Sequence, residues 1–251
     1  MQSLDILGCR LDPIDAREAT SRILDLARAG RAAQIVTLGT EMVVYAQRDE
    51  RFREIVNGCA LSLCDTVGLL TVARRRGATL RERVTGVELI EHLCSAAAAA
   101  GLSIYLMGSA EGVAADAAGI LETRYPGLRV AGARSGFFSA QEVPGIVEEI
   151  RTSQAQLLFT GLGSPRQEFW LAENLALTGC GVGVGVGGSF DVISGRVRRA
   201  PLVWRRLNLE WLYRLASEPK RWRRQLALPY FVWMIALDRL GLRNKKGTTV
   251  T

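Results

Sequence analysis

A single aspartate follows a predicted strand in the stretch LCDTVG (63–68), with apolar runs on both sides. Asp65 is placed to cap the helix that comes next, because a carboxylate at a helix start accepts backbone N–H groups. The position also suits a general base, since apolar surroundings raise a carboxylate pKa until it accepts a proton from a hydroxyl. The local pattern leaves both roles open. The chain has one histidine, His92, which we expect on a helix surface, so a carboxylate is the leading candidate for a base.

The stretch TGLGSPRQE (160–168) has the features of an anion site at a helix start. Its two glycines let backbone amides approach a ligand, and Ser164 and Pro165 are typical of an N-cap and a first helical residue. Free amides at such a helix start favour an anion. Gln167 adds paired hydrogen-bonding groups beside them. A plain turn between a strand and a helix is the alternative.

The stretch GVGVGVGG (181–188) contains a GxGxxG match. It is weak evidence for a dinucleotide site, because the glycines lie within a predicted strand and no helix pattern opens directly after them. We interpret the stretch as a strand of small residues followed by a tight turn. That turn delivers Asp191 to the end of the strand.

Several familiar catalytic motifs are absent from the chain: a GxxxxGK[ST] loop, HExxH, and an Asp-x-Asp pair that would hold a metal on a nucleotide diphosphate. No cofactor or metal is therefore expected. If the ligand is a nucleotide sugar, arginines and helix amides must stabilise the charge on its leaving phosphate.

The five cysteines are scattered and form no CxxC pair, and no basic-then-apolar signal segment precedes them. These features predict buried thiols in a reducing compartment, that is, a cytoplasmic protein.

The alternation of apolar strand patterns with helices of ten or more residues predicts an α/β fold with a parallel sheet covered on both faces. Ligands of such sheets bind at the carboxyl ends of the strands. The loops 37–41, 63–68, 106–112, 160–168 and 186–191 lie at those ends. No linker or repeat interrupts the pattern, so residues 1–195 are expected to form one domain.

The amino-acid composition changes at residue 196. We expect residues 196–251 to form a basic helical appendage. Residues 196–224 hold ten Lys or Arg and two Asp or Glu, whereas the net charge of the whole chain is +7, so the rest is near neutral. This asymmetry indicates one region that faces anions. Trp204, Trp211 and Trp222 lie among these arginines and are expected to anchor the segment.

The apolar run 226–242 contains Pro229, Asp238 and Arg239, so it is too interrupted to span a bilayer. We expect it to lie in the membrane interface, with Tyr230 and Trp233 at headgroup depth and the preceding arginines on anionic lipid. Packing on the main domain or on a partner subunit is the alternative. Self-association would also bury its apolar surface when no membrane is present.

An ordered series of motifs resembles one family. The series is ERVTG (82–86), YPGL (125–128), GLGSPRQE (161–168), GGSFDVISG (187–195), RAP (199–201) and LEWLYRLASEPKRWRR (209–224). In order and spacing it is similar to the WecG/TagA/CpsF glycosyltransferases, over about residues 37–224. These bacterial enzymes extend undecaprenyl-diphosphate-linked sugars for surface polysaccharides.

The resemblance implies an inverting, metal-independent transfer from a UDP-sugar to a hydroxyl of a polyprenyl-diphosphate-linked sugar. It also implies a Rossmann-like core and an appendage that closes over the active site and touches the inner membrane surface. The enzyme would then be a cytoplasmic protein attached peripherally to the cell membrane.

Particular residues match the family's functional positions. Asp65 matches the proposed base and Thr37 a polar residue beside the reacting sugar. The residues that match the lining of the same pocket are Arg83, Gln167 and Asp191. The residues that match appendage arginines directed at the diphosphate are Arg214, Arg221 and Arg224.

Two positions depart from the family pattern. Gly39 stands where the family usually has Asn, which removes a side-chain amide from the pocket, and Glu88 replaces a common Asp. The donor is therefore expected to be a UDP-sugar whose sugar the sequence does not specify.

Two rival functions rest on other features. A nucleic-acid-binding module would use the basic, Trp-containing segment. An NAD-dependent oxidoreductase would use the glycine-rich strand. The confinement of positive charge to one segment beside an apolar run favours the transferase and argues against a nucleic-acid partner.

Overall fold

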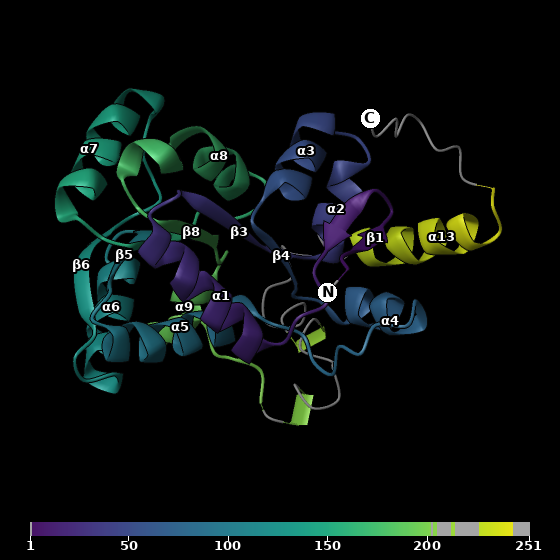
Figure 1. Ribbon diagram of the computed structural model, residues 1–251, viewed down its shortest axis with the longest axis horizontal. Helices are drawn as coiled ribbons and strands as arrows, with labels where there is room; N and C mark the ends of the chain where they lie inside the picture. Colours follow the sequence, from purple (N-terminus) through teal and green to yellow (C-terminus); the bar gives the residue numbers. More distant parts are fainter. Residues whose placement is uncertain (1, 202, 205–211, 214–225, 243–251) are drawn as a thin grey trace.

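The computed structural model of the chain describes residues 2–201, 203–204, 212–213 and 226–242. Its centre is a six-stranded sheet in the order β4-β3-β8-β7-β5-β6 (Figure 1). The strands are β3 (Ala33–Leu38), β4 (Leu61–Cys64), β5 (Ser103–Gly108), β6 (Arg129–Arg134), β7 (Leu157–Gly161) and β8 (Val182–Gly185). All neighbouring strands are parallel, so their carboxyl ends lie along one edge. The predicted α/β class is confirmed.

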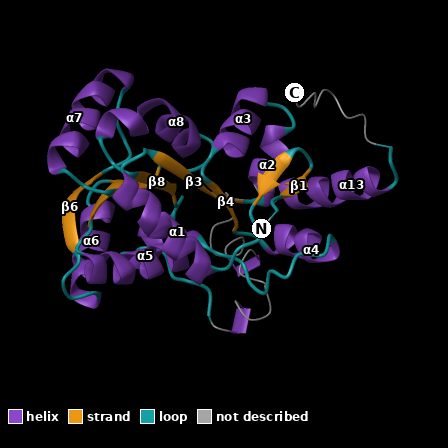
Figure 2. Cartoon of the chain, in the orientation of Figure 1, coloured by secondary structure: helices purple, strands orange, loops and turns teal. Residues whose placement is uncertain are grey.

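Helices cover both faces of this sheet (Figure 2). One face packs against α1 (Ala16–Ala29), α5 (Gly86–Ala100) and α6 (Val113–Arg124), and the other against α7 (Val143–Ser153) and α8 (Arg166–Thr178). The remaining described helices are α2 (Thr40–Ala46), α3 (Glu50–Gly58), α4 (Val67–Arg75), the 3-10 turn η1 (Ala140–Glu142), α9 (Ser189–Ile193) and α13 (Ala227–Arg239). The layered arrangement is Rossmann-like.

Several helix starts are fixed by the residue types that the sequence places there. The side chains of Asp15, Asp49 and Thr85 accept the backbone N–H groups of Glu18, Phe52 and Glu88, at 2.8, 2.9 and 3.4 Å. Each bond satisfies one donor that the first turn of a helix leaves free. Asp65 is not such a cap, because Thr66 is the N-cap residue of α4. Asp65 lies one residue before that cap, and its role as a base stays a prediction.

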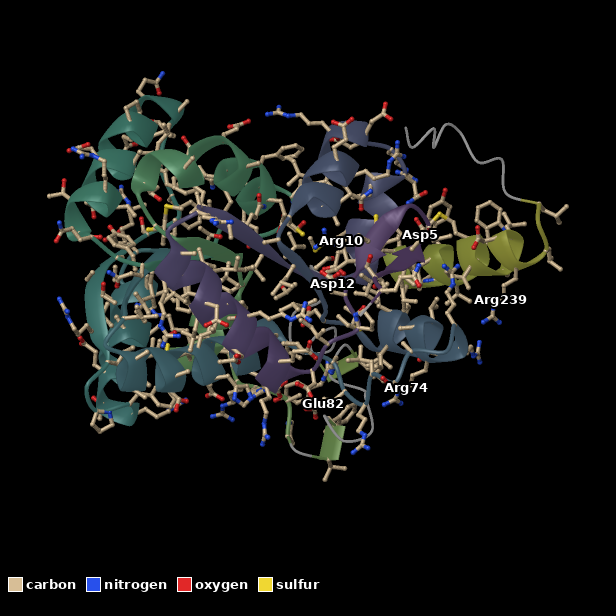
Figure 3. The ribbon with its side chains drawn as sticks, viewed as in Figure 1. Asp5, Arg10, Asp12, Arg74, Glu82 and Arg239 are labelled. Atoms are coloured by element: carbon tan, nitrogen blue, oxygen red, sulfur yellow. The ribbon has the colours of Figure 1, made fainter. Side chains whose placement is uncertain are left out.

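A small antiparallel hairpin of β1 (Leu4–Ile6) and β2 (Cys9–Leu11) closes the free edge of the sheet beside β4. Asp12 anchors it, since its backbone N–H donates to Ser62 O and its Oδ2 accepts from Ser62 N, both at 2.8 Å. Arg10 lies beside Asp12 (Figure 3) and its guanidinium donates to the same carboxylate at 2.9 Å. The hairpin thereby supplies hydrogen bonds to an otherwise exposed strand edge.

The glycines of β8 allow two helices to pack closely on the strand. A Cβ atom at Gly183 would lie 2.6 Å from Leu171 Cδ2 of α8, and one at Gly181 would lie 2.3 Å from Ala27 O of α1. The interpretation of residues 181–188 as a strand of small residues and a turn is confirmed. The expectation that no helix follows is wrong, because the short helix α9 begins at Ser189.

The C-terminal helix α13 packs on α2 and α4 instead of standing apart from the core. Phe231, Met234 and Ile235 are buried in the cluster formed by the hairpin and helices α2 to α4. An ion pair of 2.9 Å joins Arg76, directly after α4, to Asp238. One face of the run 226–242 is thus a core helix, as the alternative interpretation held. The division at residue 195 stays a prediction, since most of residues 202–225 lie outside the described residues.

Replacement of Phe231 by Ala should lower the free energy of unfolding by about 3 kcal/mol, because its ring is 1% exposed and the space it leaves cannot fully collapse. Val232 is 59% exposed on the same helix, so Val232→Ala should change it by less than about 0.5 kcal/mol. Urea denaturation of both variants measures the difference. Equal effects would show that α13 is not docked on the core.

Candidate functional site

The sheet brings five of the sequence-predicted site residues to the carboxyl edge of its strands. Thr37 lies in β3, Asp65 follows β4, Gln167 lies in the first turn of α8 after β7, and Asp191 lies in α9 after β8. Arg83 joins them because the next residue bonds to the end of β4, where Val84 N donates to Cys64 O at 2.7 Å. Their roles stay predictions, but their common location follows from the topology.

The end of β8 is held from two sides. The buried hydroxyl of Thr37 donates to Gly185 O at 2.9 Å. The side-chain oxygen of Gln167 accepts from Gly187 N at 3.0 Å, and its Nε2 donates to Glu168 Oε1 at 2.8 Å. Gln167 thereby connects the start of α8 to the turn after β8. The side-chain amide that the sequence offers to a ligand is also a structural bridge.

The start of α8 differs by one residue from the sequence prediction. Pro165 occupies the N-cap position and Arg166 begins the helix, whereas Ser164 had been expected as the cap. The Ser164–Pro165 peptide bond is cis. The guanidinium of Arg166 lies over the ring of Phe138, 4.6 Å from its centroid, so this cation faces an aromatic group.

Asp191 is positioned by the loop after β5. Ser109 Oγ donates to Asp191 Oδ2 at 2.8 Å, and Ser109 N donates to Gly161 O at 3.0 Å. Ser109 has a φ angle of +56°, in the left-handed region that non-glycine residues adopt rarely. No sequence pattern marks Ser109, because its contact with Asp191 joins loops that are 82 residues apart.

Asp65 and Arg83 gather around the end of β4. The backbone N–H of Asp65 donates to Leu38 O at 3.1 Å, which holds the residue between β3 and β4. Burial raises the pKa of the adjacent Cys64 thiol to about 12; the charge of Asp65 raises it further and that of Arg83 lowers it. The charges of Asp65 and Arg83 therefore both act on the buried Cys64 thiol.

Glu168 is a site residue whose special character the sequence did not reveal. Among the described residues it is the one Asp, Glu, Lys or Arg that is fully buried, with 1% of its surface exposed. Burial raises its pKa above the ordinary value of 4.5, against hydrogen bonds from Gln167 and Ser164, and the charge of Glu41 raises it further. A glutamate in the first turn of a helix reads as an ordinary solvated residue, so nothing local marked it.

A second contact that the sequence did not predict involves Glu88. Arg199 donates to Glu88 Oε1 at 2.6 Å, and Thr85 Oγ1 donates to the other carboxylate oxygen at 2.8 Å. This ties the start of the basic segment to the N-terminus of α5, which begins three residues beyond Arg83. The predicted diphosphate-binding residues Arg214, Arg221 and Arg224 lie outside the described residues.

Two other features of the described residues bear on chemistry. The five cysteines are buried and free, as expected, and His92 is exposed on α5. Within the same residues, no cluster of three or more His, Cys, Asp or Glu side chains is arranged to hold a metal ion.

Comparison with known proteins decides the family. Residues 4–245 match the model of the glycosyl transferase WecG/TagA/CpsF family. The chain belongs to this family of glycosyltransferases. One relative is the N-acetylglucosaminyldiphosphoundecaprenol N-acetyl-beta-D-mannosaminyltransferase of Bacillus spizizenii, 33% identical over 227 residues, which are 89% of this chain and 87% of the relative.

Membership of the WecG/TagA/CpsF family confirms the resemblance that the ordered motifs indicated, and with it glycosyltransferase activity. The match includes the stretches that carry Thr37, Asp65, Arg83, Gln167 and Asp191. It also favours the transferase over the nucleic-acid-binding module and the NAD-dependent oxidoreductase.

The raised pKa of Glu168 predicts a pH dependence of folding stability. The folded state prefers the neutral acid, so its contribution is complete below pH 4.5 and is lost as the pH rises through the raised pKa. In Glu168→Gln, whose side chain stays neutral, this loss should disappear. Unfolding free energies measured from pH 4 upward should therefore fall more in the native protein than in the variant.

The matched control is Glu122→Gln, because Glu122 is exposed on α6. The free energy of unfolding of this control should change with pH as it does in the native protein. Parallel curves for the native protein and Glu168→Gln would contradict the assignment of a neutral buried acid.

Proposed function

We propose that this chain transfers a sugar from a UDP-sugar to a hydroxyl of an undecaprenyl-diphosphate-linked sugar, in the synthesis of a bacterial surface polysaccharide. The family match over residues 4–245 carries the proposal. The name of the Bacillus relative supports the acceptor, because it describes a sugar transferred to a diphosphoundecaprenol-linked sugar. The donor is proposed as a class, UDP-sugars, because Gly39 departs from the family pattern.

The proposed reaction is a single displacement that inverts the anomeric carbon and uses no metal. Asp65 takes the proton of the acceptor hydroxyl, the oxygen forms a bond to the anomeric carbon, and the bond to UDP breaks on the opposite face. Asp65 suits this role because it lies at the carboxyl edge of the sheet, directly after β4. Such assistance contributes roughly 10²–10⁴-fold in rate.

The negative charge that develops on the departing UDP needs cations. Arg83, like Asp65, lies near the end of β4, since the following residue donates from Val84 N to Cys64 O at 2.7 Å. Arg214, Arg221 and Arg224 are proposed to reach the diphosphate, since guanidinium groups bind phosphates in a bidentate manner. These arginines would supply the stabilisation that a metal ion supplies in other transferases.

The outer face of α13 supports peripheral attachment to the membrane. Leu226, Val232, Trp233 and Leu240 are exposed on the side away from the core. Arg239, the last residue of this helix, is exposed on the surface (Figure 3). An apolar face with an arginine at its end fits an anionic bilayer surface. None of the described helices combines the length and apolar character needed to span a bilayer.

Replacement of Asp65 by Asn should lower turnover with a polyprenyl-diphosphate-sugar acceptor by about 10²-fold or more, because the amide cannot accept the proton. Folding and UDP binding should be largely retained. Kinetic assays together with UDP calorimetry measure both properties. Asp25→Asn, on the exposed side of α1, is the control with expected native turnover. Near-native turnover of the Asp65 variant would remove Asp65 from the role of base.

The double variant Val232→Ser/Trp233→Ser should bind vesicles containing anionic lipid roughly 10²-fold more weakly, since burial of each of the two apolar side chains contributes roughly 1.5 kcal/mol. Vesicle sedimentation measures the partition coefficient. Leu177→Ser is the control, because Leu177 is 60% exposed on α8, away from α13. Unchanged partitioning of the double variant would refute membrane contact by α13.

A further inference from the structure

The space above Gly39 is filled by a carboxylate. Gly39 is the N-cap residue of α2, with an extended backbone (φ −105°, ψ 163°) that any residue can adopt. A Cβ atom built there would lie 2.9 Å from Oε2 and 3.4 Å from Oε1 of Glu41. The carboxylate of Glu41 therefore folds back over residue 39. It occupies the volume where a side chain at that position would begin.

This carboxylate lies at the carboxyl edge of the sheet, among the site residues. Gly39 directly follows β3 and is two residues from Thr37, whose hydroxyl bonds to Gly185 O. On the far side, Glu168 Oε1 is 3.2 Å from the Cβ position of Gly185. Burial is the main cause of the raised pKa of Glu168, and the charge of Glu41 makes a smaller contribution in the same direction.

Glu41 differs from Glu168 in being accessible to a ligand. Glu168 is buried and accepts from Gln167, whereas Glu41 is partly exposed. Within the described part of the chain, the Glu41 carboxylate has no hydrogen-bond or ion-pair partner, although an anionic group in a partly buried position normally acquires one. An acceptor without a partner beside the reacting groups is suited to a polar ligand.

We propose that Glu41 is a specificity-determining residue for the donor sugar. Its carboxylate accepts hydrogen bonds from hydroxyl or N–H groups of the transferred sugar and repels sugars that carry a carboxylate of their own. Gly39 makes this possible because it has no side chain in the space that the Glu41 carboxylate occupies, whereas an Asn at this position would place a neutral amide there. The inference rests on the proposed function, because it assumes that a UDP-sugar occupies this edge.

The physical basis of the proposed specificity is the difference between the affinity for UDP-linked neutral sugars and the affinity for UDP-linked acidic sugars. A hydrogen bond to a charged acceptor contributes more than one to a neutral acceptor, and two like charges in a partly buried pocket oppose binding. Specificity then comes both from the attraction of neutral sugars and from the rejection of acidic ones. UDP lacks the transferred sugar, so its binding should be insensitive to Glu41.

The experiment compares three ligands on the full-length chain by calorimetry: UDP, UDP-glucose and UDP-glucuronate, the last two differing at one carbon of the sugar. In Glu41→Gln, the ratio of the Kd for UDP-glucuronate to that for UDP-glucose should fall about tenfold, because the repulsion disappears. The Kd for UDP should change less than about twofold. Glu122→Gln serves as a matched control with an unchanged ratio.

A second variant tests the role of the glycine. In Gly39→Asn the new side chain takes the space of the Glu41 carboxylate, so the ratio should shift in the same direction. Since both changes remove the same charge from the same place, the double variant should shift the ratio no further than Glu41→Gln alone.

The outcomes separate this inference from the proposed function. Unchanged ratios in Glu41→Gln, with normal UDP binding, would overturn the role of Glu41 and leave the transferase proposal intact. Additive shifts in the double variant would overturn the link to Gly39. A native protein that fails to bind UDP would overturn the proposed function, and the inference would fall with it.

Discussion

The hydrogen bonds at the end of β8 hold the candidate site together. Gly185 O accepts from Thr37 of the neighbouring strand, and Gly187 N donates to Gln167 at the start of α8. These two bonds fix the turn from which α9 and Asp191 emerge. If either bond is lost, groups supplied by β3, β7 and β8 are no longer held in one arrangement. The same backbone groups would otherwise be buried without partners, which is costly.

The glycines of β8 are the condition for this junction. At Gly185, a Cβ atom would lie 2.6 Å from Gln167 Nε2, so a larger residue would displace the bridging amide. At Gly181 and Gly183, the absence of side chains lets α1 and α8 approach the strand. The repeat GVGVGVGG is therefore a packing device in a covered strand, and its resemblance to a dinucleotide motif is coincidental.

The C-terminal helix connects the core to the proposed membrane surface. Its buried residues belong to the same cluster as α2, the helix that carries Gly39 at its cap and Glu41 in its first turn. Movement of α13 against the core would therefore reach α2 directly. If the proposed membrane contact and sugar site are correct, α2 would connect them physically, because it packs on α13 and carries Glu41 in its first turn.

The sequence by itself determined the α/β class, the parallel sheet, the buried cysteines, the glycine strand and, through its ordered motifs, the family. These features depend on local periodicity and on residue types at fixed spacing, which survive without knowledge of the fold. It also directed attention to Thr37, Asp65, Arg83, Gln167 and Asp191, because loops after parallel strands must meet at one edge.

The tertiary structure decided what these residues contact. The burial of Glu168, the Ser109–Asp191 bond, the Arg199–Glu88 pair and the placement of the Glu41 carboxylate over Gly39 join segments that are distant in sequence or depend on side-chain direction. No periodicity encodes such contacts. Only the folded chain excludes water from Glu168 and leaves Glu41 partly exposed. Burial raises the pKa of Glu168, whereas Glu41 stays accessible to a ligand.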